Sequence, residues 1–228
     1  MIARRRALAA VAALAAGVAS AQTPPSPLEL VRYAGLHAAA ARDDVAEITR
    51  LIAGGADPNA RDDHARTPLH VAAHLGHREA ARALVSGGGD PRALDSRRYD
   101  AITIAAVRDD PGFVRLAIEL GGDPRAITSP YDGTALIAAA HLGHDEVVRA
   151  LIAAGAPLDH VNNLGWTALI EAIVLGDGGR RHQACVVALV AAGARLDLAD
   201  RAGASPLALA RARSFREIEA TLLAAGAR

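Results

Sequence analysis

The sequence is poor in several residue types that define particular protein classes. It contains no lysine and one cysteine, Cys185, and aromatic residues make up 3% of its 228 residues. A single cysteine cannot form an internal disulfide, so a disulfide framework is excluded. Ala and Leu, which favour helix, dominate a 51% hydrophobic composition, whereas the residues that favour strands are sparse. We therefore predict an all-α fold of one or two domains.

The first 21 residues have the layout of a secretory signal peptide. Three arginines at 4–6 precede an apolar run at 7–18, and Ala19-Ser20-Ala21 provides a cleavage site of small residues. We predict cleavage after Ala21, so that 1–21 is a signal peptide. A membrane anchor is the alternative, but about twenty apolar residues are needed to span a bilayer. No later segment of the sequence has a longer apolar run, so we expect no membrane span after cleavage.

Removal of this leader leaves a mildly acidic chain. The remaining 22 arginines stand against 25 Asp and Glu residues, a net charge of −3. Such a surface does not favour nucleic acid, and we predict no nucleic-acid partner. Residues 22–33 begin with QTPPSP. Three prolines in six residues oppose helix, so we predict that residues 22–27 are extended and that 22–33 is a linker.

The rest of the chain repeats itself with a period near 33 residues. An apolar residue after each turn recurs at gaps of 33, 33, 34, 33 and 38, and a terminal glycine recurs at gaps of 33, 33, 34, 38 and 33. The apolar markers are Leu36, Leu69, Ile102, Leu136, Leu169 and Leu207. Each repeat is expected to form two short helices, such as 135–142 and 144–154 around Gly143. One repeat cannot bury its apolar face alone, so the repeats must stack into a solenoid.

These segments resemble the ankyrin repeat, whose signature begins Gly-x-Thr-Pro-Leu-His-x-Ala-Ala and ends Gly-Ala-Asp-x-Asn. Residues 67–73 (TPLHVAA) and 55–59 (GADPN) match it, and weaker copies begin at Gly133, Gly165 and Gly203. The third repeat departs from it with DAIT at 100–103. The resemblance covers an ankyrin repeat domain at 34–228 and implies about six helix-turn-helix repeats joined by short hairpin-like fingers. Their approximate bounds are 34–62, 63–95, 96–128, 129–162, 163–200 and 201–228.

Three histidines in TPLHVAAHLGH raise the alternative of a metal site. His70, His74 and His77 would share one face if a continuous helix carried them all. The resemblance instead implies that His70 bonds backbone groups between repeats, and that Gly76 ends the helix before His77. Only His74 and its counterpart His141 lie at variable positions. We predict no metal, no cofactor and no catalytic residue; the alternative, a metal-dependent hydrolase, would need convergent ligands that the sequence does not show.

The function that the resemblance implies is protein binding. In ankyrin repeats the finger tips and first helices form a concave surface that binds other proteins. Tyr99, Tyr131 and Trp166 fall on neighbouring fingers, and the alternative is that each packs against its own turn. Aromatic and Arg side chains on an exposed ridge are typical of binding sites. The predicted partner-binding residues are Arg66, His74, Leu75, Tyr99, Arg108, Tyr131, His141, Leu142, Trp166, Arg180 and Arg181.

The fifth repeat carries five extra residues between its helices, within GDGGRRHQ at 176–183. This segment is either a tolerated surface insertion or a second contact, in which Arg180 and Arg181 bind an acidic partner. Cys185 is expected to be a small core residue and not a nucleophile.

The combined features predict a non-catalytic, monomeric scaffold that binds another protein in the periplasm of a bacterium. Ankyrin proteins of that compartment have been linked to protection of enzymes such as catalase in oxidative stress. The resemblance therefore implies an alternative function, as a protective or accessory factor for such an enzyme. No residue of the sequence identifies catalase as the partner.

Overall fold

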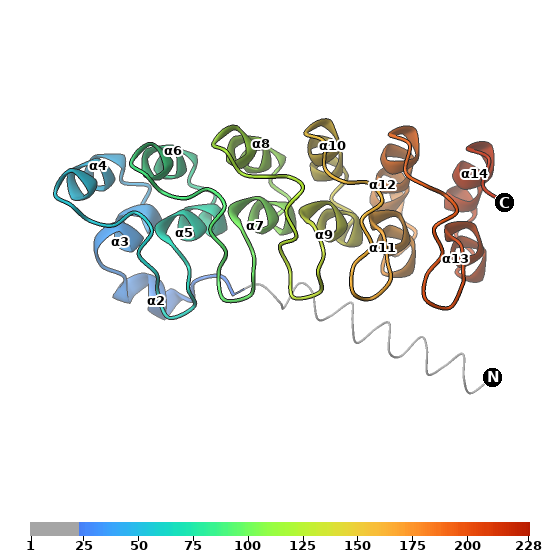
Figure 1. Ribbon diagram of the computed structural model, residues 1–228, viewed down its shortest axis with the longest axis horizontal. Coiled ribbons are helices and arrows are strands. Elements are labelled where there is room, and N and C mark those ends of the chain that lie inside the picture. Colours follow the sequence, from blue (N-terminus) through green and yellow to red (C-terminus); the bar gives the residue numbers. More distant parts are fainter. Residues whose placement is uncertain (1–22) are drawn as a thin grey trace. The chain divides into compact units, whose positions relative to one another are not determined.

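The computed structural model describes residues 23–228, and all regular elements in that range are α-helices (Figure 1). The predicted all-α fold is confirmed. The predicted signal peptide lies outside the described residues. Among the described helices, none is long and apolar enough to cross a lipid bilayer. The described chain divides into an amino-terminal body, residues 23–123 and 128–130, and a carboxy-terminal body, residues 124–127 and 131–228.

The amino-terminal body contains one leading helix followed by three helix pairs. Its helices are α2 (Pro27–Arg32), α3 (Gly35–Ala41), α4 (Val45–Ala53), α5 (Pro68–Leu75), α6 (Arg78–Ser86), α7 (Ala101–Val107) and α8 (Pro111–Glu119). Within this body α3, α5 and α7 pack as an inner row, and α4, α6 and α8 pack as an outer row (Figure 1). The inner helices approach closely because alanines such as Ala39, Ala72 and Ala105 are completely buried between them.

The carboxy-terminal body contains three further helix pairs. Its helices are α9 (Ala135–Leu142), α10 (Asp145–Ala153), α11 (Ala168–Val174), α12 (Arg180–Ala191), α13 (Pro206–Ala212) and α14 (Arg216–Ala224). Here α9, α11 and α13 form the inner row, and α10, α12 and α14 form the outer row (Figure 1). The repeat markers Leu136, Leu169 and Leu207 lie buried in the core, as their period predicts.

A polar side chain begins most inner helices by accepting a backbone N–H. Thr134, Thr167 and Ser205 do this with their hydroxyl oxygens. In the divergent third repeat the carboxylate of Asp100 accepts the N–H of Thr103 at 2.8 Å. Asp caps a helix as well as Thr does, so this repeat keeps the same turn despite its different sequence.

Residues 23–26 are not helical, but the rest of the predicted linker at 22–33 contains a helix, because residues 27–32 form α2. Ser26 caps this helix, and the side chain of Glu29 accepts the Ser26 N–H at 2.8 Å in a capping box. Pro27 occupies the first helical turn, where a missing N–H costs nothing. Pro27 therefore suits the start of a helix, and the prolines at 24 and 25 lie before it.

The insertion of the fifth repeat is only in part a loop between helices. α12 begins at Arg180 and has 12 residues, whereas the equivalent α10 has 9. The preceding turn is held by Asp177, whose Oδ1 contacts His182 Nδ1 at 2.8 Å, and by Arg213, which donates to the Gly176 carbonyl at 2.8 Å. The extra residues thus lengthen an outer helix and fix its first turn.

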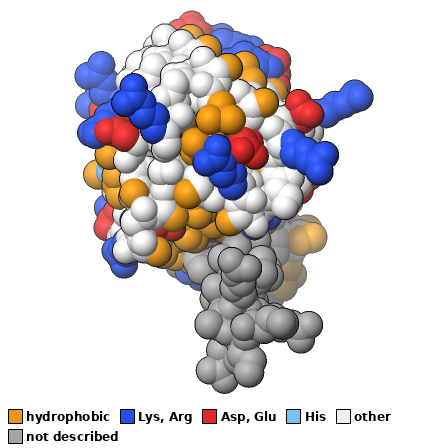
Figure 2. All heavy atoms as spheres, turned by 90° about the vertical axis from the view of Figure 1, so that its right-hand side faces the viewer, with side chains coloured by type: hydrophobic (Ala, Val, Ile, Leu, Met, Phe, Trp, Pro, Cys, Tyr) orange, Lys and Arg blue, Asp and Glu red, His pale blue; other side chains and the backbone are white. Residues whose placement is uncertain are grey.

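The last repeat presents a polar surface beyond its buried residues. Arg211, Arg216 and Glu217 are exposed on α13 and α14, and Arg211 pairs with Glu219 at 2.7 Å. Figure 2 shows the side on which these helices lie, with hydrophobic side chains interspersed among Arg and Asp or Glu side chains. The charged side chains on this side are typical of a terminal repeat, which has no further repeat to cover it.

Candidate functional site

The fingers between repeats are tight hairpins that an Asp or Asn side chain holds in shape. In the amino-terminal body Asp62 N–H donates to the Arg66 carbonyl at 3.0 Å, and Asp95 N–H donates to the Tyr99 carbonyl at 2.9 Å. In the carboxy-terminal body Asn162 and Trp166 repeat this bond at 3.0 Å. The same Asp or Asn oxygen also accepts N–H groups two and four residues later. This Asx geometry fixes the backbone at the finger tips.

Backbone hydrogen bonds also join neighbouring fingers within each body. Ser96 N–H donates to the His64 carbonyl at 2.9 Å in the amino-terminal body. Asn163 N–H donates to the Tyr131 carbonyl at 2.9 Å in the carboxy-terminal body. Residues on consecutive fingers of one body therefore contribute to one continuous surface.

Arg66 does not lie on an exposed ridge, contrary to the prediction. Its side chain is 1% exposed. The guanidinium donates to Asp62 Oδ2 at 2.7 Å, to the Thr23 carbonyl at 2.8 Å, and to Glu29. Arg66 is buried because the segment before the first repeat folds over it.

The prediction of an exposed ring is also wrong for Tyr99, which is 2% exposed. Its N–H donates to Asp95, and its carbonyl accepts the Nε2–H of His70 at 3.1 Å. The Nδ1 of His70 accepts the Thr67 N–H at 3.0 Å, which assigns the tautomer. His70 thus connects two repeats through backbone groups, as the ankyrin resemblance implies, and burial lowers its pKa.

His74 and His141, at equivalent positions near the ends of α5 and α9, are buried and are not surface contacts. His141 Nδ1 lies 3.0 Å from Glu171 Oε2, and Asn162 Nδ2 donates to Glu171 Oε1 at 2.7 Å. The position that Glu171 holds is occupied one repeat after His74 by Ile104. The His74 Nε2 atom has no hydrogen-bond partner, and burial lowers the pKa of this ring to about 3.

The three histidines of TPLHVAAHLGH do not share a helical face. α5 ends at Leu75, and Gly76 adopts a left-handed conformation with φ of 78°. His77 caps α6, and its Nδ1 donates to the Ala40 carbonyl at 2.9 Å. No group of three metal-ligating side chains occurs within residues 23–228.

Seven predicted partner-binding residues remain accessible to different degrees. Arg108, Arg180 and Arg181 are exposed. Leu75, Tyr131, Leu142 and Trp166 are half-buried. Arg181 lies 3.3 Å from Asp145 and is therefore paired within the chain.

Sequence reasoning missed two exposed apolar residues of the carboxy-terminal body. Ile127 is 44% exposed and Val161 is 47% exposed. They lie 34 residues apart at the same position in the segments that lead into consecutive fingers. Turn segments are usually polar, so two apolar residues at the repeat spacing in such segments are the signal that could have identified them.

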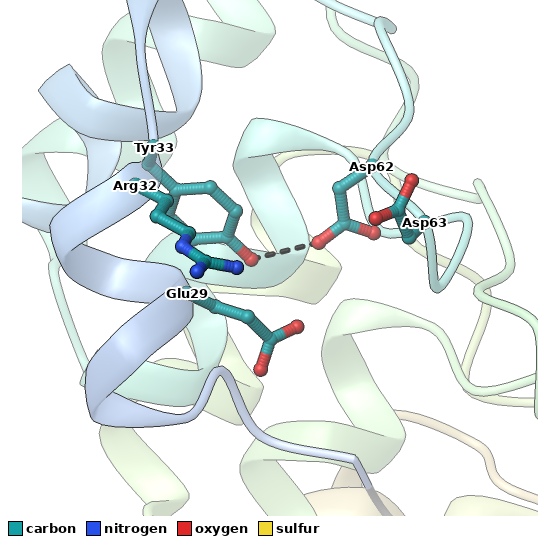
Figure 3. A pocket seen from close by; sticks show the side chains of 5 residues that line it. All are labelled: Glu29, Arg32, Tyr33, Asp62 and Asp63. Carbon is teal, nitrogen blue, oxygen red and sulfur yellow. Dashed lines mark hydrogen bonds between the residues drawn. The ribbon is translucent and has the colours of Figure 1, made fainter.

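A small cavity lies between α2 and the first finger of the amino-terminal body. It has a volume of about 230 Å³ and is lined by Glu29, Arg32, Tyr33, Asp62 and Asp63 (Figure 3). The Tyr33 hydroxyl donates to Asp62 Oδ2 at 2.7 Å across one side of it. Burial and the hydrogen bond to Asp62 raise the pKa of Tyr33, so the hydroxyl stays protonated.

Cys185 is completely buried on α12, where the sequence places a core residue. A thiol with no access to solvent does not serve as a nucleophile for an external substrate.

Comparison with known proteins shows which proteins share this architecture. The family model for ankyrin repeats in three copies matches residues 36–126 and 102–200. A putative ankyrin repeat protein of Escherichia coli, YahD, is 44% identical over 86 residues, which cover 37% of this chain and only 43% of that relative. An ankyrin repeat domain of Acinetobacter baumannii is 44% identical, with a TM-score of 0.80 over 85% of this chain and 98% of that one. The ankyrin repeat domain of Bcl-3 is 28% identical, with a TM-score of 0.78 over 86% of this chain and 87% of its own. The chain belongs to the ankyrin repeat family, whose repeats are protein-interaction scaffolds.

Proposed function

We propose that this chain is an exported, non-catalytic scaffold that binds another protein through the finger surface of its carboxy-terminal body. The observation that carries the proposal is the exposure of Ile127 and Val161 at equivalent positions of consecutive fingers. Exposed apolar side chains that recur along one surface favour a protein partner, because binding removes their area from water.

The neighbouring residues suit a binding site that is already formed before the partner arrives. Trp166 and Tyr131 are half-buried on the same fingers, and these residue types carry much of the binding energy in protein interfaces. Trp166 N–H donates to Asn162 Oδ1 at 3.0 Å, so its backbone is fixed in the finger. A fixed surface loses little conformational entropy on binding.

Export rests on the arrangement of residues 1–21, in which three arginines precede an apolar run and a small-residue cleavage site. This supports a periplasmic location for the scaffold. Protection of a periplasmic enzyme such as catalase remains the alternative role.

A capture experiment with matched surface variants tests this function. The wild-type chain and the double variant Ile127→Ser/Val161→Ser are used as baits in a periplasmic extract. Val187→Ser is the control, because Val187 is 51% exposed but lies on the outer helix α12. The proposal requires a protein that both wild type and control capture and that the double variant loses. Equal capture by all three baits would show that the finger surface is not the binding site.

A further inference from the structure

We propose that residues 23–33 are an internal ligand that occupies a carboxylate-binding site around Arg66, and that an acidic helical segment of a partner takes this site when they leave. This inference rests on the proposed binding function but concerns a different surface, in the amino-terminal body. The ligand that this surface binds is the start of a helix with one carboxylate and one free backbone carbonyl.

The contacts of Arg66 define what the site recognises. Asp62 belongs to the finger itself and accepts from the Arg66 Nε–H. The other two acceptors belong to the covering segment: the carbonyl of Thr23 and the carboxylate of Glu29 in the first turn of α2. A guanidinium presents several N–H groups in a fixed plane, which suits a carbonyl and a carboxylate together.

Polar contacts hold α2 in place, and Pro25 is the one buried residue of the covering segment. No residue of α2 is buried, and its apolar side chains Leu28 and Val31 are 58% and 84% exposed. Tyr33 adds one more polar contact through its hydroxyl bond to Asp62. A helix of six residues without a buried face has little stability of its own, so it is suited to leave and to be replaced.

Departure of the segment removes two acceptors of Arg66, Thr23 and Glu29, and uncovers its guanidinium. Arg66 keeps its charge at any physiological pH, so the N–H groups that these two residues leave can bind another carbonyl and carboxylate. Asp62 alone would then remain as its carboxylate partner. A segment that supplies a second carboxylate restores the arrangement, and the cavity beside Arg32 and Asp63 gives room at its edge (Figure 3).

Peptide binding to the full chain tests the proposal. The probe is a fluorescein-labelled peptide of residues 23–34, TPPSPLELVRYA. The test protein is Glu29→Gln/Tyr33→Phe, which weakens two side-chain contacts of the internal segment. The control is Glu47→Gln, which removes a half-buried carboxylate that pairs with Arg50 on α4 of the same body. Hydrogen–deuterium exchange over residues 23–33 reports whether the internal segment has been released.

We expect faster exchange over residues 23–33 in the double variant and at least tenfold tighter peptide binding than for wild type or Glu47→Gln. A peptide with Gln in place of its Glu should bind the double variant at least tenfold more weakly. Equal binding of the peptide to all three proteins would overturn the proposal, as would equal binding of the two peptides. Capture through Ile127 and Val161 is measured in a separate experiment. A negative peptide experiment therefore does not affect the capture result, and a negative capture experiment does not affect the peptide result.

Discussion

Replacement of the buried His74 by Leu should remove a large part of the acid sensitivity of the amino-terminal body. The ring is 5% exposed and its Nε2 has no hydrogen-bond partner, so the folded chain resists protonation there. Burial lowers the pKa of His74 from its ordinary 6.5 to about 3. Because the folded-state pKa is the lower one, its stability contribution is present above pH 6.5 and is lost as the pH falls toward 3.

The magnitude follows from the difference between the two pKa values. Each pH unit below 6.5 costs about 1.4 kcal/mol, so His74 accounts for about 2 kcal/mol of destabilisation at pH 5. Burial lowers the pKa of His70 as well, and that effect persists in the variant. The difference between wild type and His74→Leu therefore isolates the contribution of His74.

The assay is urea unfolding followed by circular dichroism at pH 7, 6 and 5. His74→Leu should be at least as stable as wild type at pH 7 and should lose about 2 kcal/mol less between pH 7 and pH 5. His141→Leu is the matched control, because it removes the contact with Glu171 and should destabilise by about 1–3 kcal/mol already at pH 7. Identical pH dependence in wild type and His74→Leu would show that His74 does not contribute to the acid sensitivity.

Other substitutions probe the core and the fifth repeat. Leu169→Ala should cost about 2–5 kcal/mol, because it leaves a cavity under a side chain that is 1% exposed; an unchanged urea midpoint would contradict this. Gly178→Ala should lower the melting temperature, since Gly178 has φ of +72° and an added Cβ would lie 2.5 Å from the Phe215 ring. Cys185 should react with a thiol reagent only after unfolding, and rapid labelling of the native chain would show that α12 opens. Arg180→Ala should leave the melting temperature within a few degrees, because the side chain is exposed.

Periodicity predicts most of the architecture because each repeat reuses the same local physics. The markers Leu69 and Leu136 are buried where their spacing places them, and Gly76 ends its helix in the left-handed conformation. The divergent start of the third repeat folds alike because Asp100 performs the capping role of Thr.

The candidate site was less predictable, because exposure depends on contacts between distant segments. Arg66 occupies a finger position, but Glu29, 37 residues earlier, folds over it. His74 and His141 hold equivalent positions and differ because the next repeat supplies Ile104 in one case and Glu171 in the other. A repeat motif aligned with itself does not contain that information.

A footprint of the complex shows whether a protein partner binds the fingers of the carboxy-terminal body. Hydrogen–deuterium exchange is measured on the wild-type chain with and without the purified partner from the capture experiment. We expect slower exchange in the peptides that contain Ile127, Val161 or Trp166, and unchanged exchange in α10 and α12. Protection confined to α10 and α12, with no change in the finger peptides, would contradict it.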